Sequence, residues 1–300
     1  MRLLGLAFCC AFSLLLGCKS KKRLSYDDST RHPVAQSAAN KGPKKTAPEA
    51  KWDDYKLTLV GVPGDASFFA GSVIHDSDDP WILSAHFTLP AGTKITLGSE
   101  SGTVESSSWH CKVPIKDAIA KAPAEDSVGK KIDLGLTLQL EIPGYELVTQ
   151  KLPLQSVKPA IGKGFARIVD RPVTFSSEPE KSPIDGLLAL DRNRTPRLFG
   201  NPKTTADIDL IAVEDQDDKP SREKTCTGYR KSKAVTLQMF DSDVKLYDRR
   251  SGKVLAERKF SASDHCPSFA FVTDGKTSNR VSDTDIDKWA RAELQKRRGQ

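Results

Sequence analysis

Apolar and polar residues alternate over several short segments in the first half of the chain. The clearest alternations cover residues 56–60, 81–89, 94–97 and 132–140, and turn residues such as glycine and proline follow each of them. Because successive side chains of a β-strand point to opposite faces, this period of two predicts strands with one buried face. Many short strands separated by turns favour a β-sandwich-like domain over residues 51–158, with an immunoglobulin-like architecture as the first choice.

A second group of strand-like segments precedes a helical pattern at the C-terminus. The strand-like segments cover residues 208–213, 234–240, 244–247 and 254–260. After Asp283, the large apolar residues Ile286, Trp289 and Leu294 recur at the spacing of one helix face. Residues 207–300 are therefore predicted to form a small α+β domain that ends in a helix, and the fold class of the whole chain is mainly β.

The segment between these two domains, residues 159–206, shows no clear periodicity of apolar residues. Six prolines interrupt the segment, and proline ends both helices and central strands. Two short apolar runs, Phe165–Val169 and Leu187–Leu190, are long enough to add a strand to either neighbouring domain. We interpret 159–206 as a proline-rich connector.

The first 17 residues have the pattern of a secretory signal peptide. Arg2 supplies a positive start, and the almost wholly apolar run from Leu3 to Leu16 follows it. This run is shorter than the roughly 18 apolar residues that a bilayer-spanning helix needs. The run ends in the sequence Leu14-Leu15-Leu16-Gly17-Cys18.

The segment from Leu14 to Cys18 resembles the lipobox of bacterial lipoproteins. The resemblance implies that residues 1–17 are removed and that the thiol of Cys18 carries a diacylglycerol, with acyl chains such as palmitate. Because two acyl chains suffice for stable attachment, the protein is expected to be anchored to membrane lipid at the cell envelope. Lys19 follows the cysteine, where an aspartate favours inner-membrane retention in enterobacterial lipoproteins. The outer membrane is therefore favoured if the cell has two membranes.

Charge is concentrated in the segment that follows Cys18. The chain has a net charge of +7, but residues 19–50 hold eight lysines and arginines and only three acidic residues, so the remainder is close to neutral. This distribution argues against a nucleic-acid partner. Residues 18–50, rich in Lys, Ser, Ala and Pro, are expected to form a disordered basic tether. Its lysines either attract anionic headgroups or simply keep a linker solvated.

Six cysteines divide by position along the chain. Cys9 and Cys10 lie in the signal peptide and Cys18 is the expected lipidation site, which leaves Cys111, Cys226 and Cys266. An envelope compartment permits disulfides, and three thiols allow one bridge in three pairings. We favour Cys226–Cys266 because both residues flank one strand-rich block.

No motif in the sequence specifies a reaction, a metal or a cofactor. His110-Cys111 and His265-Cys266 form two His-Cys pairs, but neighbours on a strand point to opposite faces, so each pair supplies one ligand at most. Gly162-Lys163-Gly164 lacks the third glycine of a dinucleotide fingerprint. The carboxylates of residues 283–287 fit the first turn of a helix better than a calcium loop, which requires glycine and glutamate at later positions. We therefore predict no metal site, no catalytic residue and no cofactor.

These observations favour a non-catalytic binding or scaffolding protein of the cell envelope, with an envelope protein or peptidoglycan as a possible partner. The first alternative is an envelope hydrolase that acts on peptidoglycan or protein. The second is a thiol redox or metal-binding envelope protein, which requires a reactive Cys111 near His75 or His86.

Overall fold

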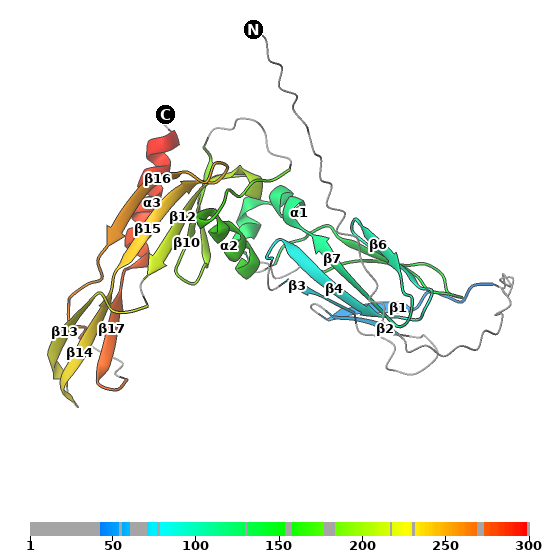
Figure 1. The fold of residues 1–300 in the computed structure, drawn as a ribbon, viewed down its shortest axis with the longest axis horizontal. Helices are drawn as coiled ribbons and strands as arrows, with labels where there is room; N and C mark the ends of the chain where they lie inside the picture. Colours follow the sequence, from blue (N-terminus) through cyan, green and yellow to red (C-terminus); the bar gives the residue numbers. More distant parts are fainter. Residues whose placement is uncertain are drawn as a thin grey trace, which may run out of the picture.

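A computed structural model describes most of the chain beyond the expected tether. The described residues are 43–53, 56–60, 71–76, 79–129, 131–153, 158–176, 184–216, 218–229, 232–268 and 273–298. The expected signal peptide, Cys18 and most of the tether lie outside them. Figure 1 shows a β-sandwich and a C-terminal α/β part joined side by side into an elongated body.

The N-terminal part consists of two antiparallel sheets. The first contains, in spatial order, β1 (Glu49–Asp53), β2 (Lys56–Val60), β3 (Gly71–His75), β4 (Ile82–Thr88) and β7 (Ser108–Pro114). The second contains β6 (Glu100–Thr103), β5 (Lys94–Leu97), β8 (Thr137–Glu141) and β9 (Val148–Lys151). After β4 the chain crosses to the second sheet for the hairpin β5–β6 and then returns for β7 beside β4.

Alternating burial explains why these segments form a sandwich. Leu57 and Leu59 of β2 are buried while their neighbours are exposed, and Leu138 and Leu140 of β8 repeat this pattern on the other sheet. The buried residues of both sheets belong to one hydrophobic cluster. The predicted β-sandwich-like domain is therefore confirmed.

The C-terminal part is built on a five-stranded mixed sheet. Its spatial order is β11 (Pro196–Gly200), β10 (Gly186–Leu190), β12 (Ile208–Gln216), β15 (Ser242–Asp248) and β16 (Val254–Phe260). Only β10 and β12 pair in parallel. The helix α3 (Asp283–Arg298) covers one face with Ile286, Trp289, Ala290 and Leu294, while α2 (Lys158–Ala166) and the 3-10 turn η2 (Arg167–Val169) lie against the other. The predicted α+β part with a C-terminal helix is confirmed.

A smaller three-stranded sheet extends from the end of this part that lies farther from the sandwich (Figure 1). It contains β13 (Arg222–Tyr229), β14 (Ser232–Phe240) and β17 (Lys276–Arg280). We call these strands, together with residues 261–268, the lobe. Among its described residues, one cluster of buried side chains comprises Cys226, Leu237, Met239 and Ala262, with Cys266 packed against it.

The segment between the two predicted domains contributes to the C-terminal sheet. Leu187–Leu190 lies in strand β10, as one reading of the sequence anticipates. Phe165–Val169 is not a strand: it forms the end of α2 and the turn η2, because Ile161, Phe165 and Ile168 recur at helical spacing and are all buried. At the other end, Glu49 and Ala50 belong to β1 and not to the tether.

Two glycines allow α2 to pack tightly between the sandwich and the C-terminal sheet. A Cβ atom on Gly164 would lie 2.3 Å from the ring of Trp81, and one on Gly162 would lie 1.8 Å from the carbonyl oxygen of Arg194. The glycines that superficially resemble a nucleotide-binding motif thus serve close packing. Around them, Trp81 meets Phe165 and Phe175 edge to face at centroid distances of 5.6 and 6.1 Å, so one core continues from the sandwich into the C-terminal part.

A fully buried arginine joins three further segments at this junction. The guanidinium of Arg249 donates hydrogen bonds to the carbonyl oxygens of Ile208 at 2.5 Å, Val173 at 2.7 Å and Ala206 at 2.9 Å. It also lies 4.8 Å from the ring centroid of Phe175. Arg249 therefore ties the loop after η2 to the start of β12.

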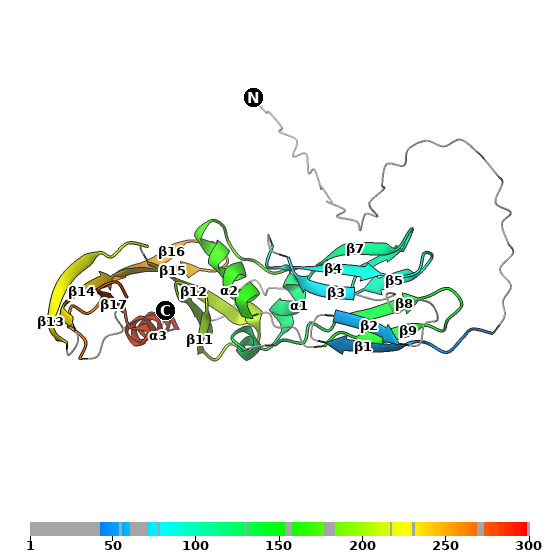
Figure 2. The same cartoon turned by 90° about the horizontal axis from the view of Figure 1, so that it is seen from below.

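The described chain begins at the end of the sandwich farthest from the lobe (Figures 1 and 2). There the Lys45 N–H donates to the Gly144 carbonyl, and the Glu146 N–H donates to the Lys45 carbonyl, both at 2.9 Å. The last residues of the expected tether are thus held against the turn between β8 and β9.

Candidate functional site

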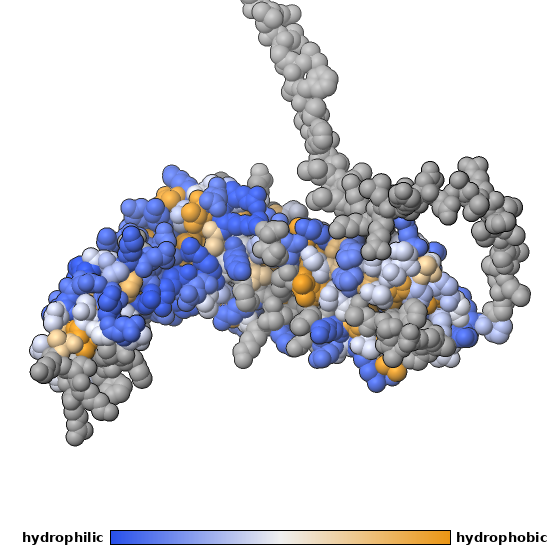
Figure 3. Space-filling view, turned by 60° about the horizontal axis from the view of Figure 1, so that its bottom comes forward, coloured by the Kyte–Doolittle hydropathy of each residue, from blue (hydrophilic) through white to orange (hydrophobic). Residues whose placement is uncertain are grey.

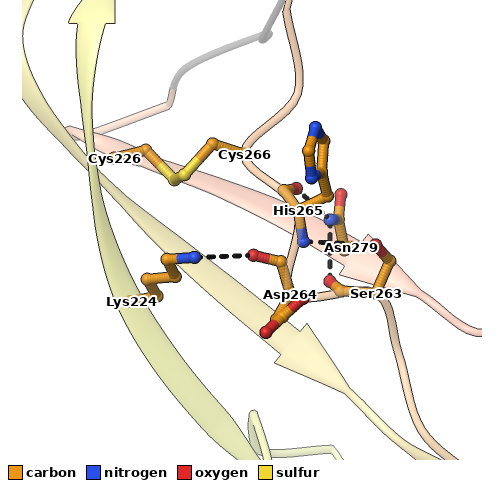
Figure 4. The surroundings of a disulfide bond; sticks show 7 residues. All are labelled: Lys224, Cys226, Ser263, Asp264, His265, Cys266 and Asn279. Carbon is orange, nitrogen blue, oxygen red and sulfur yellow. Dashed lines mark hydrogen bonds between the residues drawn. A yellow bond between two sulfur atoms is a disulfide. The ribbon is translucent and has the colours of Figure 1, made fainter.

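The predicted disulfide is present and closes the lobe. Cys226 of β13 is bonded to Cys266, which lies 40 positions later in the segment after β16. Figure 4 shows how residues 263–265, which precede Cys266, are held by further hydrogen bonds. The Lys224 ammonium donates to the Asp264 carbonyl at 3.2 Å, and the Asn279 amide donates to the carbonyls of Ser263 and His265 at 2.9 and 3.0 Å. Cys226 is almost fully buried. The bond ties the segment of residues 261–268 to strand β13.

Asp241 connects the lobe to the larger sheet. It lies between β14 and β15, and its carboxylate accepts hydrogen bonds from the Ala262 N–H at 2.9 Å and from Arg222 at 3.0 Å. Burial alone raises the pKa of Asp241, but these two donors outweigh burial and hold the pKa below its ordinary value. Because Arg222 also donates to the Ala262 carbonyl at 2.9 Å, the three residues form a closed hydrogen-bonded unit.

We expect Asp241→Asn to weaken the lobe at neutral pH and to have little effect in acid. A carboxyl group with a lowered folded pKa contributes stability above its unfolded pKa of about 3.9, and this contribution is lost as the pH falls through the folded pKa. At about pH 7 the substitution should lower the free energy of unfolding by about 1–2 kcal/mol, since a charged acceptor is replaced by a neutral one. Urea unfolding of both proteins at about pH 7 and about pH 2.5 measures it. The exposed Asp243→Asn is the matched control; a pH-independent effect of Asp241→Asn would contradict the argument.

The structure separates the residues of the two His-Cys pairs. His110 and Cys111 lie on β7, where Cys111 faces the interior and is 6% exposed, while His110 is on the outer face beside His86 of β4. His86 and Cys111 therefore occupy opposite faces of the sheet. The side chain of His75 lies outside the described residues. His265 is exposed in the lobe, and within the described ranges no group of three or more His, Cys, Asp or Glu side chains is arranged to hold a metal.

The acidic run at the start of α3 is engaged by an arginine. Arg197 of β11 contacts Asp283 at 3.4 Å and Asp287 at 2.9 Å. These carboxylates thus fix the first turn of α3 against the edge of the five-stranded sheet, in agreement with their interpretation as a helix start.

The most promising binding site is a pocket of about 370 Å³ at the junction of the sandwich and the C-terminal part. We call it the junction pocket. It is lined by Asp79, Trp81, Ile82, Pro114, Lys116, Arg167, Arg171, Pro172 and Val173. Its lining comes from the start of β4, the end of β7, the helix α1 (Lys116–Lys121) and η2 with the loop that follows it. Pockets of this size between structural units are typical small-molecule sites.

The junction pocket has an apolar floor and a cationic rim. Trp81 is 6% exposed. Its backbone N–H donates to the Asp79 carboxylate at 3.0 Å. Arg167 lies 3.4 Å from the same carboxylate, and the ammonium of Lys116 lies 5.8 Å from the centroid of Phe175. The described lining thus contains the cations of Lys116, Arg167 and the exposed Arg171, and the carboxylate of Asp79. Sequence reasoning missed this site because its members are spread over residues 79–173 and carry no motif.

A second hollow of about 410 Å³ lies on the C-terminal sheet. Its described lining includes the acidic residues Asp215, Asp243 and Glu257. It also includes the basic residues Arg194, Lys245 and Lys259. The equal numbers give this hollow no preference for an anion or a cation. Figure 3 shows a face on which hydrophilic residues predominate over the C-terminal part and hydrophobic patches are small and separate, which is unlike an extended apolar docking surface.

Comparison with known proteins gives no relative to guide the choice between these sites. No family model matches the chain, and neither the curated proteins nor the solved structures include one that is significantly similar to it. Among the helices of the described segments, none combines the length and the apolar character needed to cross a bilayer.

Proposed function

We propose that this chain is a lipid-anchored, non-catalytic binding protein of the bacterial cell envelope, and that it takes an anionic ligand in the junction pocket. The acylated Cys18 attaches the protein to membrane lipid, with the outer membrane favoured in a cell that has two membranes. The cationic rim of the junction pocket is the observation that carries the binding role. Carboxylate-bearing partners of the envelope, an envelope protein or a peptidoglycan stem peptide, match this chemistry.

The arrangement of the pocket supports an anionic ligand that also has an apolar portion. Lys116, Arg167 and Arg171 lie at the rim, and Asp79 is the one carboxylate among the described lining residues. Trp81, Ile82 and Val173 supply an apolar floor beneath them. Hydrogen bonds to charged groups contribute about 1.5–3 kcal/mol each, so two or three such contacts to a carboxylate select for charge, while the floor excludes water.

A binding experiment with a matched control tests this role. We expect an N-acetylated stem peptide with free carboxylates to bind the full-length protein, and its fully amidated form to bind at least about tenfold more weakly. Lys116→Gln and Arg171→Gln should each weaken binding of the free acid by about tenfold. Lys121→Gln, at the exposed far end of α1, is the matched control. Isothermal titration calorimetry measures these affinities; equal binding of the acid and amide, or an equal loss in Lys121→Gln, rejects the pocket.

The anchor is tested separately from the pocket. Intact-mass analysis of protein extracted from its native membrane should show the mass of acyl chains on a chain that begins at Cys18. Cys18→Ala should move the protein from the membrane to the soluble fraction. An unmodified thiol at Cys18 would refute the anchor without bearing on the junction pocket.

The two alternative functions, an envelope hydrolase and a thiol redox protein, predict different results when the purified protein is assayed. An envelope hydrolase would turn over muropeptide, peptide or ester substrates, whereas a binding protein returns them unchanged. A thiol redox protein would depend on Cys111, which is buried on the inner face of β7 and away from the face that carries His86.

A further inference from the structure

Two histidines are stacked on the outer face of the sandwich. His86 of β4 and His110 of β7 are direct partners in the antiparallel register. Their rings are nearly parallel, with an interplanar angle of 9° and a centroid distance of 4.1 Å. Both residues are exposed, and β4 and β7 are adjacent strands of the sheet (Figure 1).

The spacing of this pair suits chelation of one metal ion. Cβ atoms of directly opposite residues lie about 4.5–5.5 Å apart, and metal–imidazole nitrogen distances are about 2.0–2.1 Å. The lone pair of an imidazole nitrogen lies in the plane of its ring, so the two exposed side chains must rotate out of the stacked arrangement before one nitrogen from each points at the same ion. The sheet fixes both backbones in advance, which reduces the ordering that binding requires.

The surrounding charges leave room for a cation. On the same face of the sheet, the next pair in one direction is Ser84 and Lys112, and in the other direction Thr88 and Ser108. The Lys112 ammonium lies 2.9 Å from the Asp76 carboxylate, which also accepts a hydrogen bond from the Ser84 hydroxyl at 2.9 Å. Among the described neighbours on this face, the Lys112 ammonium is therefore paired with a carboxylate, and the remaining ladder partners carry hydroxyl groups.

We propose that His86 and His110 form a surface site for a divalent transition-metal ion, with water completing the coordination. Imidazole ligands suit copper, nickel and zinc, and the affinity of such a site rises to a maximum at Cu²⁺ along the first-row series. Two nitrogens with water in the remaining positions match the tetragonal preference of Cu²⁺. This site is independent of the junction pocket and of the lipid anchor.

Titration of the full-length protein with Cu²⁺ tests the site. We expect His86→Ala and His110→Ala each to weaken Cu²⁺ binding by at least about tenfold, since even indirect damage to a metal site reduces affinity 10–100-fold. Chelation needs both rings, so each single substitution already abolishes it. The double variant should therefore bind Cu²⁺ with an affinity within a few fold of that of either single variant. His265→Ala, which removes an exposed histidine from the lobe, is the matched control. Retained affinity in both single variants, or an equal loss in His265→Ala, overturns the proposal.

A spectroscopic measurement on the unaltered protein makes the test independent of how the variants fold. Electron paramagnetic resonance of the complex with one equivalent of Cu²⁺ should show hyperfine coupling to two imidazole nitrogens. Coupling to one nitrogen or to none would overturn the proposal.

Discussion

Replacing Arg249 with leucine is expected to lower the free energy of unfolding by at least about 3 kcal/mol, because three buried carbonyl groups lose the donor that satisfies them. Arg249 is fully buried and donates to the carbonyls of Ile208, Val173 and Ala206. Leucine fills much of the space but donates nothing, so buried carbonyl groups lose their partners, and each such loss costs about 1–3 kcal/mol. The junction between the sandwich and the C-terminal part should therefore open at lower denaturant.

Urea unfolding monitored by tryptophan fluorescence measures this loss, because Trp81 belongs to the same junction. The adjacent Arg250→Gln is the matched control: its side chain is 26% exposed and lies 3.5 Å from Asp209, and partly exposed ion pairs contribute about 1 kcal/mol or less. If both variants unfold at the same urea concentration, Arg249 is not the residue that holds the junction.

Removing the disulfide with the double variant Cys226→Ala/Cys266→Ala is expected to destabilise the lobe by roughly 3–4 kcal/mol, the chain-entropy value for a loop of this length. The bond closes a separation of 40 residues. Cys226 belongs to a buried cluster of the lobe's described residues and Cys266 packs against it, so the substitution removes the covalent link between residues 261–268 and β13.

Hydrogen exchange locates this effect. Amides of β13 and β14 should exchange much faster in the double variant, whereas those of β10 and β12 in the five-stranded sheet should keep their protection. Chemical reduction of the unaltered protein should reproduce the same pattern. Uniform loss of protection across both sheets would show that the bond supports the whole C-terminal part and not the lobe alone.

The parts of the fold that the sequence predicted are those fixed by local patterns. Alternation in Lys56–Val60 and Ile82–Thr88 is confirmed by strands β2 and β4, because one buried face imposes a period of two. The face of Ile286, Trp289 and Leu294 is confirmed as the buried side of α3. The favoured Cys226–Cys266 pairing is confirmed as well, and it followed from the position of both cysteines around one block of strands.

The parts that the sequence did not reveal depend on contacts between distant segments. Phe165–Val169 is an apolar run whose helical period is visible only when Ile161 is counted with it, and two flanking glycines disfavour a helix unless close packing requires them. The junction pocket combines Asp79, Lys116 and Arg171, which meet only because α2 brings η2 against the sandwich. The stacking of His86 on His110 depends on the register of β4 and β7, which no local pattern encodes.

The bare backbone that α2 presents at Gly162 and Gly164 has a consequence for recognition. A tryptophan ring lies against the helix at one glycine and a peptide carbonyl at the other, so α2 is packed closely beside η2, whose Arg167 lines the junction pocket. A ligand would enter a preorganised cleft and would not need to draw two modules together. Its affinity would then depend on fit and charge, with little entropy lost in closing a hinge.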